Sequence, residues 1–538
     1  MTLSALLAAA IAFGTPADTV PLYDNLGDHQ YAITTRVPLA QRYFDQGLRL
    51  YYAFNHAEAV RSFREAQRLD PSCAMCFWGE ALAWGPNINL PMDSAAAVEA
   101  YAALLKATAV QTGADARERA LIAALATRYA PVPPADRTAL DSAYARAMAE
   151  VSRRFPNDPE AAVLHAEALM DLRPWNYWTK DLELQPGMQV ALSQLERIVA
   201  TNAKHPGACH FYIHAVEAAF PERAVACAER LAGLMPGAGH LVHMPGHIYI
   251  RVGRYLDAIK ANEHAVHADE TYIRDQRPGF GTYTAGYYPH NYDFLAFAAA
   301  MAGRSRQALS AADKLGELAS PEMMGEPGMT FTQHHATRRL QLRVRFERWD
   351  EILATPAPRP HLPHARAMWH YAHGRALVAT GKAGDAEADL AAVRAAVADP
   401  RLQGVRLEFN EAPAILGIAA EVLAGHLAAA RGEPDVAVAR LQAAARLEDD
   451  LSYGEPPDWT VPVRHDLGAV LLAAGRPADA ERAFREDLAR FPRNGWSLRG
   501  LAHALEAQGR GREAAEAMAE YRAAWSDADL PAAHHPGH

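Results

Sequence analysis

The stretch YFDQGLRLYYAFNHAEAVRSFREAQRLDP, Tyr43–Pro71, predicts the fold of this chain. Gly47 is followed by Ala59 after 12 residues and by Phe63 after 16. Glycine and alanine let two helices approach closely, an aromatic ring fills the adjoining space, and a proline ends the second helix. The stretch therefore predicts a pair of antiparallel helices.

The same spacing recurs along the chain. In LGAVLLAAGRPADAERAFREDLARFP, Leu467–Pro492, Gly468 is followed by Ala480 and Phe484 at the same intervals of 12 and 16. Shorter forms of the pattern start at three further glycines: Gly246, Gly374 and Gly425. A helix pair that cannot bury its own apolar face has to stack on its neighbours. The pattern therefore predicts a stacked array of helix hairpins.

The two quoted stretches resemble tetratricopeptide repeats, a family whose unit is a pair of antiparallel helices of about 34 residues. The resemblance implies an all-α superhelical array, an α-solenoid, in which the first helix of each hairpin lines a concave groove. Gly374, Gly425 and Gly468 are spaced by 51 and 43 residues, which predicts inserted loops between the hairpins. The resemblance is specific for fold and leaves the function open.

The predicted array divides into parts at a proline-rich stretch, PAPRPHLP. The parts are a first array over residues 18–355, a linker over 356–365, a second array over 366–527 and a tail over 528–538. Two aromatic loops stand out in the first array, Asp171–Pro186 and Arg277–Pro289. Insertions in a solenoid tend to gather on its binding face, so we expect both loops to wall a pocket.

Composition excludes several classes of function. The chain carries 53 Lys and Arg against 63 Asp and Glu, dispersed without a basic block, so nucleic acid is not an expected partner. No internal apolar run approaches the roughly 20 residues that a membrane-spanning helix needs, so no membrane span is expected. A phosphate-cradling glycine loop and a Gly-x-Ser-x-Gly elbow are absent from the sequence, so neither a nucleotide cofactor nor serine catalysis is expected.

The first residues resemble a secretory signal. MTLSALLAAAIAFG, Met1–Gly14, is an apolar run, and Thr15 and Ala17 have cleavage-like spacing before Asp18, although a basic segment is missing. We expect residues 1–17 to be removed and the protein to be periplasmic or extracellular. A buried first helix in a cytoplasmic protein is the alternative interpretation.

Histidines are concentrated in the middle of the chain, where nine of the 24 lie between His205 and His290. Spacings of three, four and seven residues place side chains on one stripe of a helix. Three sets have these spacings: His210, His214 and Glu217; His240, His243 and His247; and His290 with Asp293. Neighbouring helices that present such stripes can bring several imidazoles together.

Converging imidazoles favour a transition-metal site, because coordination needs three or four donors from several elements. The expected metal ligands are His210, His214, His240, His243, His247 and His290. Glu217 and Asp293 are expected to orient the rings or to bind directly. Zinc, copper, iron and nickel all suit imidazole ligands.

Two functions fit this pattern. The first is a groove protein that binds a peptide, a small molecule or a partner segment and carries the metal site in its middle repeats. The second is a metal-dependent enzyme, a hydrolase or an oxidoreductase, in which His210, His214, His243 and His247 hold the metal.

Cys73, Cys76 and Glu80 have the same offsets from Gly79 as the second histidine set has from Gly246, so they are also expected to face the groove. Phe77 stands where haem attachment needs a histidine, so no haem is expected. A disulfide, a redox pair and two half-buried thiols remain open, and the thiols are the favoured interpretation.

The signal interpretation gives the first prediction. Protein recovered from its native host should begin near Asp18 when its N-terminus is sequenced, because the signal segment is cleaved on export. An intact Met1 would favour the buried first helix instead.

Overall fold

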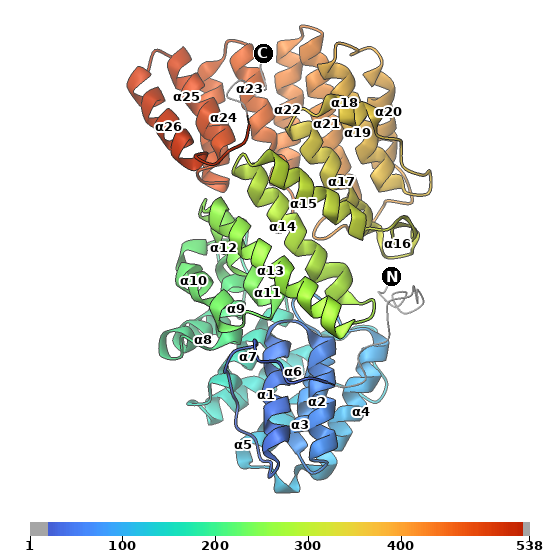
Figure 1. The fold of residues 1–538 in the computed structure, drawn as a ribbon, viewed down its shortest axis with the longest axis vertical. Coiled ribbons are helices and arrows are strands. Elements are labelled where there is room, and N and C mark those ends of the chain that lie inside the picture. The colour runs from blue at the N-terminus through green and yellow to red at the C-terminus, as the bar shows by residue number, and fades with distance from the viewer. Residues whose placement is uncertain (1–19, 531–538) are drawn as a thin grey trace. The chain divides into compact units, whose positions relative to one another are not determined.

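The chain is all-α, as the sequence predicts. The computed structural model describes residues 20–530, so the predicted signal segment, residues 1–17, and residues 531–538 of the predicted tail lie outside the described residues. Between residues 20 and 530 the regular structure is helical, with isolated β-bridges and no β-strand. The helices follow one another as hairpins over most of this length (Figure 1).

The described chain forms two compact units. The first unit comprises the described residues up to Ile248 together with Ala261–Tyr288. The second comprises Tyr249–Lys260 and the described residues from Pro289 onward. The predicted proline-rich linker, residues 356–365, falls inside the second unit.

The first unit is built from successive helices that pack on their neighbours in the chain, for example α1 on α2, α3 on α4 and α7 on α8. Its helices, of which the last two also carry residues of the second unit, are α1 (Pro38–Tyr52), α2 (His56–Leu69), α3 (Ala74–Ala83), α4 (Ser94–Val110), α5 (Ala116–Leu125), α6 (Thr138–Arg154), α7 (Pro159–Asp171), α8 (Met188–Thr201), α9 (Pro206–Val216), α10 (Val225–Leu234), α11 (Gly239–His243), α12 (Pro245–Arg251) and α13 (Tyr255–Gln276).

The second unit repeats this organisation, with α19 on α20, α21 on α22, α23 on α24 and α25 on α26. Its helices are α14 (Tyr288–Met301), α15 (Ser305–Leu318), α16 (Pro321–Gly325), α17 (Thr330–Arg345), α18 (Trp349–Ala354), α19 (Pro363–Ala379), α20 (Ala386–Val397), α21 (Ala412–Ala430), α22 (Pro434–Asp449), α23 (Val463–Ala473), α24 (Pro477–Arg490), α25 (Gly495–Ala507) and α26 (Gly511–Ala524).

Both stretches that predicted the fold are helix hairpins, α1–α2 and α23–α24. In the first hairpin, a Cβ on Gly47 would lie 2.6 Å from the Phe63 ring, and a Cβ on Gly79 of the next hairpin would also overlap that ring. Phe63 is fully buried between these two glycines. The aromatic residue thus joins a hairpin to the hairpin that follows it.

The second hairpin repeats this contact. A Cβ on Gly468 or on Gly500 would overlap the ring of Phe484. In both hairpins the phenylalanine follows one glycine by 16 residues and precedes the other by 16. The repeat prediction is therefore confirmed at the level of individual contacts.

Helix α21 contradicts the expectation that no internal apolar run approaches the length of a membrane span. α21 is 19 residues long and is apolar enough to cross a membrane by length and composition, although 67% of its apolar window is buried inside the protein. It packs against α19, α20 and α22, and Leu423 and Leu427 are buried in the apolar core of the second unit. These contacts indicate a core helix.

The cysteine interpretation was wrong. Cys73 and Cys76 form a disulfide rather than two half-buried thiols, and both residues are fully buried. Cys73 precedes α3 and its sulfur accepts the Cys76 N–H at 3.1 Å, so the start of the helix already brings the two side chains together. Glu80, one turn further on, receives hydrogen bonds from Arg64 and Gln67 at 2.6 Å each.

The glycine contact can be tested by substitution. Gly468→Ala should lower the free energy of unfolding by about 1–3 kcal/mol, because the new methyl group overpacks the Phe484 ring. Gly511→Ala is the matched control, since it lies at the start of α26 with no atom near its Cβ position. We expect it to be neutral or to stabilise by up to about 1 kcal/mol. Urea unfolding followed by circular dichroism measures both, and equal midpoints would contradict the contact.

Candidate metal centre

Five of the six predicted histidine ligands come together in the first unit. His210 and His214 lie on α9, His240 and His243 on α11, and His247 on α12. All five side chains are buried, with at most 2% of each residue exposed. Burial of five imidazoles in one place is costly unless their polar atoms find partners.

The local sequence fixes α9 against α1. Pro206 is suited to the first turn of a helix, and His205 caps the helix because its Nδ1 accepts the Ala208 N–H at 3.2 Å. A Cβ on Gly207 would overlap the Tyr52 ring, so glycine allows the close approach of the two helices. That approach brings His210 to the last residue of α1.

The spacing of His240, His243 and His247 suggested a single helix, but the structure divides this stripe between two helices. Pro245 has no N–H, and the chain divides at Met244 into α11 and α12. Met244 keeps helical dihedrals, with φ of −49° and ψ of −35°, so the stripe is preserved across the division.

Oxygen acceptors hold the Nδ1 atoms of these rings. His210 Nδ1 lies 2.7 Å from the Tyr52 carbonyl, and His243 Nδ1 lies 2.8 Å from Asn262 Oδ1 on α13. A carbonyl oxygen only accepts, so both Nδ1 atoms carry the proton and donate it. The Nε2 atom of each ring then keeps its lone pair.

Glu217 faces the Nδ1 atoms of two further rings. It is fully buried at the end of α9, with Oε1 3.3 Å from His214 Nδ1 and Oε2 2.9 Å from His247 Nδ1. A carboxylate behind an imidazole fixes its tautomer and increases the basicity of the other nitrogen. Glu217 therefore lies where it can orient both rings, which is one of the two roles expected from the sequence.

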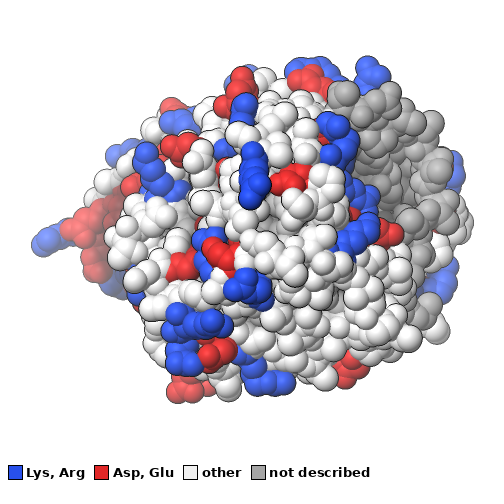
Figure 2. Space-filling view, turned by 90° about the horizontal axis from the view of Figure 1, so that it is seen from below, with Lys and Arg blue, Asp and Glu red and all other residues white. Residues whose placement is uncertain are grey.

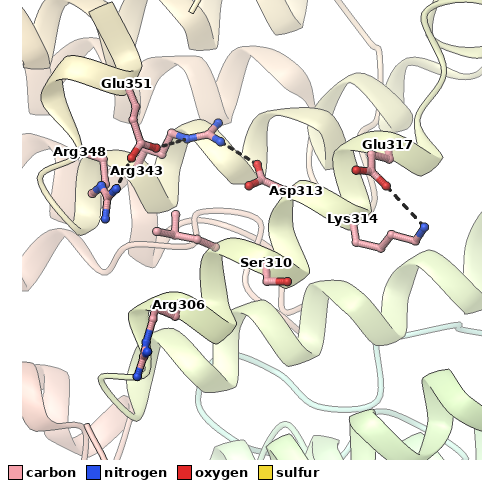
Figure 3. A pocket seen from close by; sticks show the side chains of 9 residues that line it. Arg306, Ser310, Asp313, Lys314, Glu317, Arg343, Arg348 and Glu351 are labelled. Carbon is pink, nitrogen blue, oxygen red and sulfur yellow. Dashed lines mark hydrogen bonds and ion pairs between the residues drawn. The ribbon is translucent and has the colours of Figure 1, made fainter. Parts of the chain in front are cut away.

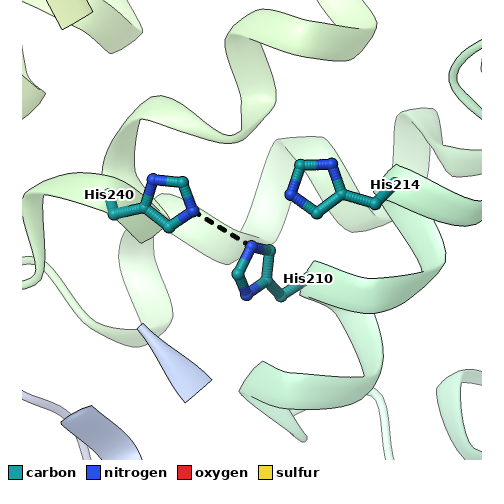
Figure 4. Close-up of side chains that lie close together, drawn as sticks. All are labelled: His210, His214 and His240. Atoms are coloured by element: carbon teal, nitrogen blue, oxygen red, sulfur yellow. Dashed lines mark hydrogen bonds between the residues drawn. The ribbon is translucent and has the colours of Figure 1, made fainter. Parts of the chain in front are cut away.

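The Nε2 atoms converge on one another. His240 Nε2 lies 3.2 Å from His210 Nε2 (Figure 4), and His243 Nε2 lies 2.9 Å from His247 Nε2. One donor atom each of His210, His214 and His240 lies within 4.8 Å of the other two. The Nε2 atom of His214 is buried and has no hydrogen-bond partner among the described residues.

The two aromatic loops reach this cluster. The Trp175 ring centroid lies 5.1 Å from that of His214, and the Tyr287 centroid lies 4.6 Å from that of His240. Tyr287 ends a five-residue π-helical turn, Tyr283–Tyr287, and such turns are frequent at functional sites. Residues of both loops thus border the histidines.

Phe54 covers the cluster from the turn between α1 and α2. Its ring centroid lies 4.4 Å from that of His210 and 5.3 Å from that of His240. Phe54 has a φ of 55°, a left-handed conformation that Gly253 and Gly475 adopt in other hairpin turns. Holding a bulky residue there costs on the order of 1–2 kcal/mol, and such strain collects at functional sites.

Burial decides the protonation of the cluster. It lowers the pKa of His210, His214 and His243 well below the usual histidine value, and the charge of neighbouring imidazoles lowers each pKa further. The three rings are therefore neutral at pH 7, the form in which imidazole binds a metal.

His290 and Asp293 lie on the part of α14 that belongs to the second unit. Asp293 forms an ion pair with the buried Arg338, whose Nη2 lies 3.0 Å from the carboxylate. The buried His335 forms a further pair with the partly buried Glu408 nearby, and although burial opposes ionisation, the charge of His335 lowers the pKa of Glu408 to about 2.

Sequence reasoning missed one polar cluster in the first unit. Glu160 Oε1 lies 2.8 Å from His29 Nε2 and 3.2 Å from His205 Nε2, and Tyr52 donates its hydroxyl proton to the same carboxylate. Burial opposes ionisation, yet the two histidines hold the pKa of Glu160 well below its usual range. Only the histidine count between His205 and His290 hinted at this group.

A charged pocket of about 510 Å³ lies in the second unit, lined by α15, α17 and α18 (Figure 3). Its charged side chains pair with one another: Arg343 contacts Asp313 at 2.8 Å and Glu351 at 3.2 Å, and Lys314 contacts Glu317 at 3.4 Å. On the face shown in Figure 2, basic and acidic side chains are likewise interspersed.

Comparison with protein-family models and with curated proteins finds no match. Among solved structures, the human IFIT1 dimer with m7Gppp-AAAA is 12% identical over 92% of each chain, with a TM-score of 0.33. The APC/C hetero-tetramer Cut9–Hcn1 is 13% identical over 91% of this chain and 74% of that chain, with a TM-score of 0.30. The P58(IPK) TPR domain is 12% identical over 88% and 99%, with a TM-score of 0.23.

These likenesses are too low to carry an argument about ligands or activity. The fold assignment rests on the helix hairpins and on the repeated contact between glycine and phenylalanine. The hairpins and this contact define an all-α array that resembles tetratricopeptide repeats in fold.

The protonation of the cluster gives a pH prediction. Because folding lowers these histidine pKa values, the unfolded chain binds more protons, and stability falls as the pH drops below about 6.5. Between pH 7.5 and 5.5 the His214→Gln variant should lose about 1.4 kcal/mol less of its free energy of unfolding than the parent protein does. Urea unfolding in the presence of a chelator measures this loss. The exposed His264→Gln is the control, and equal losses in both variants would contradict the interpretation.

Proposed function

We propose that the first unit binds a transition-metal ion through His210, His214 and His240. The observation that carries the proposal is the direction of the ring nitrogens. Nδ1 atoms of His210 and His214 face oxygen acceptors, and their Nε2 atoms turn toward the space beside His240. Histidine rings in which one nitrogen donates to an oxygen, and the other nitrogen points to a place shared with further rings, are typical of metal ligands.

A packing role explains the same contacts less well. A buried histidine that only packs usually has both ring nitrogens satisfied, whereas His214 Nε2 is buried without a hydrogen-bond partner among the described residues. His370 and His373 of the second unit, by contrast, each contact Asp389 at 2.7 Å and are partly exposed.

The donor set restricts the identity of the metal. Three imidazole nitrogens suit zinc, copper, iron and nickel, and they do not suit magnesium or calcium, which prefer oxygen ligands. Three protein donors leave one coordination position of the metal open for a further ligand. Structural zinc sites lack such an open position, because four protein ligands fill them.

The ligand that fits beside this site is small. The five histidines are buried and aromatic rings of Phe54, Trp175 and Tyr287 border them, so an extended peptide could not reach the donors without rearrangement. We therefore propose a small molecule at the metal, and a peptide or partner segment only elsewhere on the array.

A metal-dependent enzyme is the second candidate, either a hydrolase or an oxidoreductase. It is favoured by the strained Phe54 turn and the π-helical turn at Tyr287, because backbone features of this kind cluster at active sites. A metal held by three imidazoles supplies an activated water or a redox centre.

We also propose that the protein is exported, as its first residues suggest. The Cys73–Cys76 disulfide supports this location, because such bonds persist in oxidising compartments.

Metal binding can be tested with Co²⁺, whose visible absorption reports a site with imidazole ligands. The parent protein should bind Co²⁺, and a variant with both His210→Asn and His214→Asn should lose at least 100-fold in affinity at this site, because two of three donors are gone. Metal analysis after dialysis against zinc gives a second readout.

His264→Asn, on the exposed side of α13, is the matched control and should bind like the parent. Circular dichroism at each step confirms that the helices are retained. A parent protein without bound metal after reconstitution would reject the proposal.

A further inference from the structure

We infer that the histidine cluster of the first unit holds two metal ions. The first ion is the one proposed above, on His210, His214 and His240, and the second lies on His243 and His247. The inference rests on the proposed function and adds the number of ions and the ligands of the second.

One ion cannot use all five imidazoles. Ligand nitrogens lie about 2.0–2.1 Å from zinc, so two ligands of one ion are at most about 4.2 Å apart, and a tetrahedral ion accepts four. The structure groups the donors as a set of three within 4.8 Å and a pair only 2.9 Å apart.

The two Nε2 atoms of His243 and His247 are placed so that they can share a cation. His243 Nδ1 points to Asn262 Oδ1, His247 Nδ1 lies 2.9 Å from Glu217 Oε2, and the two Nε2 atoms face each other at 2.9 Å. Two lone pairs at this distance repel unless a cation lies between them. Both rings are fully buried or nearly so, and a metal ion between them, unlike a proton, can bind further ligands that share its charge.

Glu217 connects the two groups. Its two oxygens contact His214 of the first group and His247 of the second, and it is fully buried. One carboxylate thus orients a ligand of each ion. Asn262, by contrast, contacts His243 and serves only the second group in the contacts described above.

Equilibrium binding of Co²⁺ or Zn²⁺ to the full chain tests the number of ions. The parent should bind two equivalents. A variant with His243→Asn and His247→Asn should bind one equivalent, at the three-histidine site. A variant with His210→Asn and His214→Asn should also bind one equivalent, at the pair His243 and His247.

The outcomes separate this inference from the proposed function. One equivalent in both the parent and the His243→Asn, His247→Asn variant would overturn the second ion and leave the first site intact. No metal in the parent would overturn both. One equivalent in the parent that is lost in the His243→Asn, His247→Asn variant would place the only ion at the pair and overturn the three-histidine site.

A second pair of variants tests the orienting contacts. Asn262→Ala should weaken one of the two binding steps by about 10–100-fold and leave the other unchanged. Glu217→Gln should weaken both steps, because its oxygens contact a ring of each group. Equal effects of the two substitutions on both steps would contradict the division of the cluster into two sites.

Discussion

Close contact between glycine and an aromatic ring is the constraint on which the rest of this structure depends. Phe63 and Phe484 each occupy the space that two glycines leave open, one in their own hairpin and one in the next. A side chain in place of either glycine would push successive helices apart. The contact therefore sets both the distance and the register between the hairpins that it joins.

The histidine cluster depends on the same constraint. Gly207 lets α9 approach Tyr52 of α1, and only at that distance can the Tyr52 carbonyl accept the proton of His210 Nδ1. Tyr52 also donates its hydroxyl to Glu160, so one residue joins the cluster to the polar group around His29 and His205. Packing and polar chemistry are in this way controlled by the same few helix contacts.

The sequence predicted the hairpins and most of the cluster because both leave a periodic pattern. Intervals between Gly47, Ala59 and Phe63 report helix packing, and the stripe formed by His210 and His214 reports a shared helix face. Contacts between distant segments leave no such pattern. A backbone acceptor such as the Tyr52 carbonyl has no residue signature, and the buried Arg338 that pairs with Asp293 could not be anticipated from spacing alone.

The burial of the five histidines affects how fast a bound ion could be released. The five histidines are buried, so an ion held there could leave only when segments that cover the cluster move aside. Release would then be governed by the frequency of local opening, whatever the strength of the bonds to the ion. An ion captured while the chain folds would remain with that molecule for far longer than its affinity alone implies.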